Sequence, residues 1–119
     1  MTARTRKPAS IGHEEVMVEE LAKDPAFAAE YLSAVLADGN VDEMLLGLRR
    51  VTQAHGGIAK VAARAKLNPT SLYRALSATG NPELRSLSAL LSAMGMRLAV
   101  QSAATSKADR RGGKRAHVT

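Results

Sequence analysis

The sequence predicts an all-α protein, a bundle of about five helices followed by a short C-terminal β-strand. Apolar residues recur at helical intervals between breaks rich in Gly, Pro, Asp and Asn, which is typical of amphipathic helices. The aromatic content is only 3%, so the core has to be built from Leu, Val, Ala and Met. A chain of 119 residues, 45% hydrophobic, suits one small domain.

Two helices are expected before residue 40. The first, Ile11 to Lys23, carries Met17, Val18 and Leu21 among charged residues. Asp24 then caps a second helix, and Pro25 fits its first turn, where no backbone N–H is needed. This second helix ends near Gly39, and its apolar positions are Phe27, Tyr31, Leu32, Val35 and Leu36.

A third helix is expected to begin at Val41 and Asp42, with Asp42 as its cap. Gly56 and Gly57 should end it, because glycine commonly follows the last turn of a helix. Its apolar stripe consists of Met44, Leu45, Leu48 and Val51.

Residues 57–77, GIAKVAARAKLNPTSLYRALS, predict two short helices joined by a tight turn. Leu67 is expected to pack inward at the turn, while Asn68 caps the second helix and Pro69 takes its first position. The first helix turns Ile58, Val61, Ala62 and Ala65 inward, and the second buries Leu72 and Leu76. The pattern is that of a helix-turn-helix, whose second helix lies in a DNA major groove.

The last helix is expected between a turn at residues 80–82 and Gly95, with an apolar face of leucines and Met94. Beyond it, Met96, Leu98 and Val100 alternate with more polar residues, which is the period of a half-buried strand. A lone strand leaves its backbone groups unpaired, so it requires a symmetry mate or another protein. An extended arm on the domain surface is the alternative.

The formal net charge of +6 is unevenly distributed. Residues 1–9 carry +3 and residues 10–48 carry −8, whereas residues 49–101 carry +7 and residues 102–119 carry +4. Phosphate should repel the acidic part and attract the basic helix-turn-helix part.

These shifts in charge and composition predict four regions. They are a flexible basic N-terminus (1–10), an acidic N-terminal helical region (11–40), a helix-turn-helix DNA-binding domain with its C-terminal strand (41–101), and a disordered basic tail (102–119). The tail contains the cations Arg110, Arg111, Lys114 and Arg115. They either add non-specific attraction to phosphate or only make the chain more soluble.

Several functions are not expected from the sequence. The chain has no Cys, and its three histidines, at positions 13, 55 and 117, are scattered, so neither a metal nor a cofactor is expected. No phosphate-binding glycine loop and no nucleophile with an evident His partner are visible, so an enzyme is not expected. No leader and no apolar run long enough to span a bilayer are visible, so a cytoplasmic protein is expected.

Residues 24–101 resemble the small antitoxins of HigA type, the antidotes of addiction modules, whose helix-turn-helix belongs to the Cro/lambda-repressor (Xre) family. The stretches that carry the resemblance are DPAFAAEYLSAVLADG, GGIAKVAARAKLNPTSLYRALSATGNPEL and LLSAMGMRLAVQ. The resemblance implies a lambda-repressor-like bundle that binds an inverted-repeat operator as a homodimer and represses its own operon. It also implies a toxin partner of the RelE/HigB ribonuclease class.

The resemblance also implies which residues contact DNA. Mapped onto the motif, they are Gly57, Lys60, Lys66, Asn68, Thr70, Ser71, Tyr73 and Arg74, with Asn81 as a weaker candidate. Arg74 can fork onto a guanine, or it is a solvated surface residue, while Tyr73 contacts DNA or fills the core. Lys66 stands where the family usually has Gly, so a left-handed turn there costs about 1 kcal/mol, unless the turn is reshaped or Lys66 recovers this through a phosphate.

Partner surfaces are expected outside the motif. The acidic region from Glu14 to Glu43 suits a basic toxin, and the candidate toxin-binding residues are Glu14, Glu15, Glu19 and Glu20. The predicted dimer or partner strand presents Met96, Leu98 and Val100. The alternative is a stand-alone Xre-family transcriptional regulator without a toxin, because the same motif serves both kinds of protein. A short basic protein encoded next to this gene would favour the antitoxin.

Overall fold

The computed structural model describes residues 9–103, with side chains from residue 12 onward. The predicted flexible N-terminus, apart from its last two residues, and the predicted basic tail, apart from its first two, lie outside the described residues. Within them the chain forms six helices and no strand, so the all-α prediction of about five helices is confirmed, and each of the six lies in a segment where a helix was expected. The helices are α1 (Ala9–Lys23), α2 (Pro25–Asp38), α3 (Val41–Ala54), α4 (Ile58–Ala65), α5 (Pro69–Ala75) and α6 (Leu84–Ala93).

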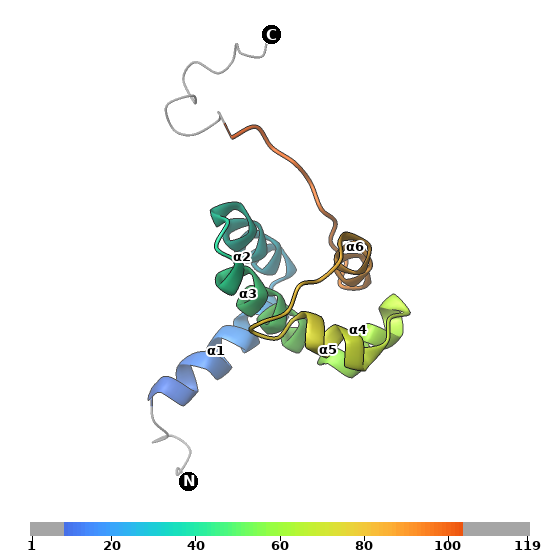
Figure 1. The fold of residues 1–119 in the computed structure, drawn as a ribbon. Helices are drawn as coiled ribbons and strands as arrows, with labels where there is room; N and C mark the ends of the chain where they lie inside the picture. Colours follow the sequence, from blue (N-terminus) through green and yellow to red (C-terminus); the bar gives the residue numbers. More distant parts are fainter. Residues whose placement is uncertain (1–8, 104–119) are drawn as a thin grey trace.

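The third helix, α3, lies at the centre of the arrangement (Figure 1). It packs against α1 and α2, while α4 packs against α5 and α6. Gly47, in the middle of α3, lets α2 approach closely, since a Cβ there would lie 2.8 Å from Cγ2 of Val35. All six helices contribute to one hydrophobic cluster. None of the buried apolar residues of the described part is aromatic, as the low aromatic content predicts.

Local capping signals set two of the helix starts as predicted. Oδ1 of Asp24 accepts a hydrogen bond from the backbone N–H of Phe27 at 3.0 Å, with Pro25 in the first turn of α2. Oδ1 of Asn68 accepts from the N–H of Ser71 at 2.9 Å and caps α5. Each cap satisfies a backbone donor that a helix start otherwise leaves unpaired.

The predicted cap of α3 is wrong by two residues. Asn40 has the extended backbone of a cap, and its Oδ1 accepts from the N–H of Glu43 at 3.0 Å. Asp42 lies inside the first turn of α3 instead, where its charge interacts favourably with the helix dipole. The sequence placed two capping residues close together, and the one that follows the left-handed Gly39 is used.

The turn of the helix-turn-helix is left-handed at Lys66, with φ 61° and ψ 42°. The N–H of Leu67 donates to the carbonyl oxygen of Ala62 at 2.9 Å, and the N–H of Lys66 donates to that of Ala63 at 3.3 Å. This is a Schellman ending, which usually has Gly at the left-handed position. Lys66 is the one residue other than Gly with a positive φ in the described part. Of the two alternatives that the sequence left open, the turn is left-handed and is not reshaped to avoid the Cβ of Lys66.

The predicted C-terminal strand is not formed in the described residues. After Gly95 the chain leaves α6 as an extended segment (Figure 1), but no second segment of the described part pairs with it. Met96 remains half-buried against the core, whereas Leu98 is 38% and Val100 97% exposed. Residues 96–101 therefore alternate as an extended segment does, and their backbone forms no β-ladder with any other described residue.

Candidate nucleic-acid and partner interfaces

The second helix of the motif, α5, has one buried face and one open face. Leu72 and Leu76 are 3% and 0% exposed and anchor it in the core, as their spacing of four predicts. The side chains between and before them are exposed, and they are Thr70, Ser71, Tyr73 and Arg74. Tyr73 is 68% exposed, so it does not fill the core. A helix anchored in this way presents its polar residues as a row on the protein surface.

The first helix of the motif, α4, adds donors and cations at its two ends. Gly57 precedes it with φ 96°. The first N–H groups of α4, like those of any α-helix, have no partners within the helix. Lys60, in the first turn, and Lys66, after the last turn, are exposed. Oriented N–H groups next to a lysine are suited to a phosphate oxygen.

The charge around these helices has one sign. Residues 44–82 contain no Asp or Glu. Their six cations are Arg49, Arg50, Lys60, Arg64, Lys66 and Arg74. Arg50 is held in an ion pair, and Arg64 donates to the carbonyl oxygen of His55 at 2.8 Å. Lys60, Lys66 and Arg74 have no ion pair within the described residues, so their charge is directed to solvent.

Of the eight residues that the motif predicts to contact DNA, Gly57 directly precedes α4, and the other seven lie on α4, on α5 or at the turn between them. Asn68 and Ser71 are joined by the capping hydrogen bond, which leaves the amide NH₂ of Asn68 available as a donor. Asn81, the weaker candidate, is exposed in the linker between α5 and α6 and belongs to neither helix of the motif.

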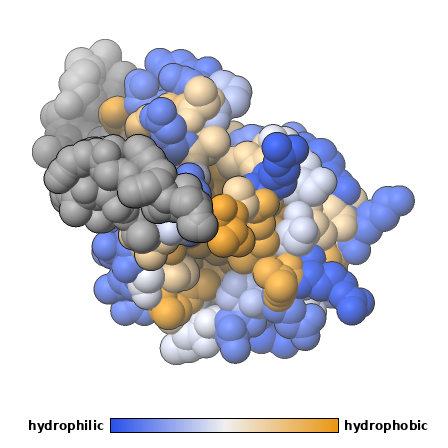
Figure 2. Space-filling view, turned by 90° about the horizontal axis from the view of Figure 1, so that it is seen from above, coloured by the Kyte–Doolittle hydropathy of each residue, from blue (hydrophilic) through white to orange (hydrophobic). Residues whose placement is uncertain are grey.

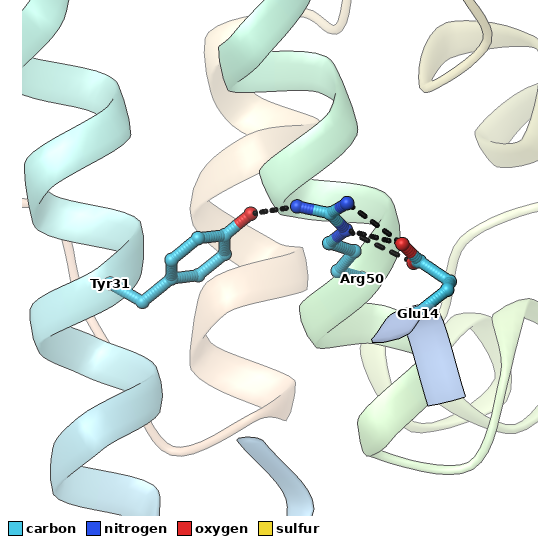
Figure 3. Close-up of polar contacts among 3 residues, drawn as sticks. All are labelled: Glu14, Tyr31 and Arg50. Atoms are coloured by element: carbon cyan, nitrogen blue, oxygen red, sulfur yellow. Dashed lines mark hydrogen bonds and ion pairs between the residues drawn. The ribbon is translucent and has the colours of Figure 1, made fainter. Parts of the chain in front are cut away.

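The acidic face of α1 is tied to α3 through Arg50, which the sequence did not single out. The guanidinium of Arg50 donates to both carboxylate oxygens of Glu14, with Nη2 to Oε1 at 2.7 Å, and to the hydroxyl of Tyr31 at 3.2 Å (Figure 3). Figure 3 shows the guanidinium between side chains of α1 and α2. The hydrogen bond from Arg50 lowers the pKa of the Glu14 carboxyl below its ordinary value.

A groove runs between α1 and α3, with a volume of about 530 Å³. Three of the four predicted toxin-binding carboxylates line it, together with two arginines of α3. Its lining residues are Glu14, Glu15, Val18, Glu19, Leu46, Arg49, Arg50 and Gln53. The fourth carboxylate, Glu20, does not line the groove and pairs with Lys23 at 3.5 Å. Glu15 and Glu19 have no ion pair within the described part of the chain.

A smaller groove of about 330 Å³ lies beside α5. Its lining residues are Arg49, Gln53, Ile58, Tyr73, Ser77 and Ala78. Arg49 and Gln53 line both grooves, so the two meet at the C-terminal half of α3. The groove beside the acidic face of α1 and the groove beside the end of α5 therefore adjoin along α3.

The segment after α6 is the third predicted surface. Of its three apolar residues, Met96 packs against the core, and Leu98 and Val100 remain open to solvent. Figure 2 shows hydrophobic residues gathered near the centre of the face toward which this segment rises in Figure 1.

Comparison with known proteins identifies a relative and a family model that match this chain. A Haemophilus influenzae protein, described as an uncharacterized protein, is 30% identical over 71 residues, which are 60% of this chain and 72% of that protein. No solved structure matches the chain. No helix in residues 9–103 is long and apolar enough to cross a membrane. A family model described as "Probable addiction module antidote protein" matches residues 14–102, most of the chain, and the protein therefore belongs to this family.

Proposed function

We propose that this protein is a DNA-binding antitoxin of HigA type that represses its own toxin–antitoxin operon. An antidote family implies a toxin partner of some kind. The observation that carries the DNA-binding part is the open face of α5. It presents Thr70, Ser71, Tyr73 and Arg74 to solvent, in a stretch of chain without any acidic residue. Antidote proteins are not normally enzymes, and the proposed function includes no catalysed reaction.

In this proposal α5 lies in the major groove. The guanidinium of Arg74 forks onto O6 and N7 of a guanine, and Thr70 and Ser71 reach a base edge or a phosphate oxygen. Lys60 and Lys66 contact phosphates, together with the N–H groups after Gly57. Base contacts from α5 carry the sequence preference, while the α4 contacts carry affinity that depends on salt.

The DNA-binding form is a homodimer. Two recognition helices about 34 Å apart read the two halves of an inverted repeat. The extended segment around Leu98 and Val100 supplies the contact between the copies, because its exposed apolar side chains and unpaired backbone groups are both covered when two segments pair.

The toxin partner in this proposal is a basic ribonuclease of the RelE/HigB class, and it docks in the groove between α1 and α3. Val18 and Leu46 give the groove apolar walls, and Glu15 and Glu19 offer carboxylates that have no ion pair within the described residues. Basic side chains next to an apolar contact are complementary to such a groove.

Footprinting tests the proposal directly. The full chain is added to DNA from upstream of its own gene, with and without the product of the adjoining reading frame. We expect protection of an inverted repeat whose half-sites are about 10 base pairs apart, centre to centre, or a multiple of that spacing. Absence of any protected site would overturn the repressor function. A protected site without an adjoining toxin gene would instead indicate a stand-alone Xre-family regulator.

A further inference from the structure

Arg49 lies in α3, outside the helix-turn-helix, yet it hydrogen-bonds to the end of the recognition helix. Its Nη1 donates to the carbonyl oxygen of Leu76 at 2.5 Å, across 27 residues of sequence. Leu76 is the C-terminal cap of α5, where a helix leaves carbonyl oxygens without partners. A guanidinium at this place satisfies one of them and interacts favourably with the negative end of the helix.

The C-terminal end of α5 is also fixed by the linker that follows it. The N–H of Gly80 donates to the carbonyl oxygen of Ser77 at 2.8 Å. A Cβ at Gly80 would lie 2.0 Å from the carbonyl oxygen of Ala75, so the linker backbone runs directly against the last turn of the helix. With only seven residues, α5 has little rigidity of its own. Its orientation relative to α3 therefore depends on contacts at this end.

The position of Arg49 suits a supporting role better than a DNA contact. Its side chain is half-buried, and its guanidinium lies between the two grooves, where it is already engaged by Leu76. Of the exposed side chains of α5, Tyr73 lines the same groove as Arg49, whereas Thr70, Ser71 and Arg74 do not line it. A shift of the Leu76 end by a fraction of an ångström would move Arg74, two residues earlier, relative to a base edge.

We propose that Arg49 is a positioning residue for DNA recognition. It holds the C-terminal end of α5 at a set orientation to α3, so that Thr70, Ser71 and Arg74 meet the bases, and it contacts neither base nor phosphate itself. The effect of Arg49 on DNA affinity rests on the proposed DNA-binding function. The effect of Arg49 on the stability of the C-terminal end of α5 can be measured without DNA.

The test compares two variants of Arg49 with a control. Arg49→Met removes the donor and keeps an unbranched apolar stem, whereas Arg49→Lys retains a cationic donor. Arg85→Met removes an exposed arginine of α6 and serves as the control. Each full-length protein is titrated with the footprinted promoter site and with random DNA of equal length, at several salt concentrations.

We expect Arg49→Met to weaken binding to the promoter site about tenfold, the effect of losing one charged hydrogen bond. Affinity for random DNA and the salt dependence should not change, and Arg49→Lys should recover most of the loss. A salt slope reduced by about one would instead make Arg49 a phosphate contact and overturn the proposal. Unchanged affinity for the promoter site would overturn it as well.

Hydrogen exchange on the full chain tests, without DNA, whether Arg49 stabilises the end of α5. The N–H groups of Leu76 and Ser77, which donate to Leu72 and Arg74, report on the end of α5. In Arg49→Met we expect them to exchange about tenfold faster, while the N–H of Gly57, which donates to Thr52, keeps its rate. Faster exchange in a protein that binds no specific DNA would refute the proposed function and leave the support of α5 by Arg49 in place. Unchanged exchange would refute the support itself.

Discussion

A single residue, Lys66, carries the clearest local conflict in this chain. The Schellman ending of α4 places it in the left-handed region at φ 61°, where a Cβ crowds the following carbonyl group. The corresponding ending of α6 has Gly95 at φ 80° and the same pair of hydrogen bonds, from Met96 to Leu91 and from Gly95 to Ser92. The two helix ends thus share one geometry, and only one of them has the residue that fits it without strain.

Replacing Lys66 with Gly should therefore stabilise the protein. We expect Lys66→Gly to raise the free energy of unfolding by about 0.5–1 kcal/mol, the left-handed strain less the entropy that glycine adds to the unfolded chain. Urea unfolding followed by circular dichroism measures it. The matched control is Lys60→Gly, inside α4, which should lower the same quantity by about 1 kcal/mol. A loss of stability in both variants would contradict the strain at Lys66.

At the scale of elements, α1 is joined to α3 by the ion pair of Glu14 and Arg50. This pair spans 36 residues of sequence and links the acidic helical region to the centre of the bundle. The side chain of Glu14 is 49% exposed, whereas that of Arg50 is only 19% exposed. Its contribution is thus that of a partly screened pair, below about 1 kcal/mol.

The ion pair gives stability a defined dependence on pH. Because folding lowers the pKa of Glu14, its contribution is present above the ordinary pKa of the carboxyl and is lost as the pH falls through the lowered value. We expect the free energy of unfolding of the wild type to fall more steeply with decreasing pH in this range than that of Glu14→Gln. Thermal melts in a series of acidic buffers measure this. Arg50→Met should flatten the curve in the same way, and parallel curves for all three proteins would contradict the ion pair.

Changing the charge of the groove between α1 and α3 should weaken toxin binding. We expect the double change Glu15→Lys and Glu19→Lys to weaken binding of the adjoining gene product at least about tenfold, with a smaller effect at high salt. Isothermal titration at two salt concentrations measures it. The control is the double change Glu30→Lys and Asp38→Lys, which alters the net charge equally on exposed positions of α2. Equal losses in both proteins would remove the groove from the toxin interface.

At the scale of the whole molecule, the segment after α6 is the part that a single chain leaves incomplete. Its backbone is extended, and its apolar residues Leu98 and Val100 are exposed in the described structure. The six helices close one common core, so this segment does not need a partner for the fold. In the proposed function, its pairing with a second copy forms the dimer that reads two half-sites.

Dimerisation can be tested on this segment without disturbing the core. We expect Leu98→Lys together with Val100→Lys to shift the protein from dimer to monomer, because paired segments would bury both charges. Sedimentation velocity at micromolar concentration measures the shift, and circular dichroism checks that the helices remain. Ala99→Lys, on the other side of the alternation, is the control and should leave the dimer intact. A wild type that is monomeric at this concentration would contradict the dimer.

Much of the fold was predictable because its signals are local. Asp24, Asn68 and Pro69 lie within one turn of the helix starts they set, and the leucines of α5 show their buried face by a spacing of four. Where two local signals competed, at Asn40 and Asp42, prediction failed by two residues. The open face of α5 was predictable for the same reason, and the exposed fraction of Tyr73 was the detail that needed the structure.

The sequence by itself determined the helices, the core without aromatic residues and the motif in its basic stretch, because periodicity and caps depend on neighbouring residues. It left open whether the turn at Lys66 is left-handed or reshaped, and the structure shows the left-handed form. Only the tertiary structure decided which distant groups meet. It paired Arg50 with Glu14 and Arg49 with the carbonyl of Leu76, and it left the segment after α6 extended rather than forming the predicted strand. An ion pair across 36 residues has no local signature, and a β-ladder requires a second strand that the described chain does not supply.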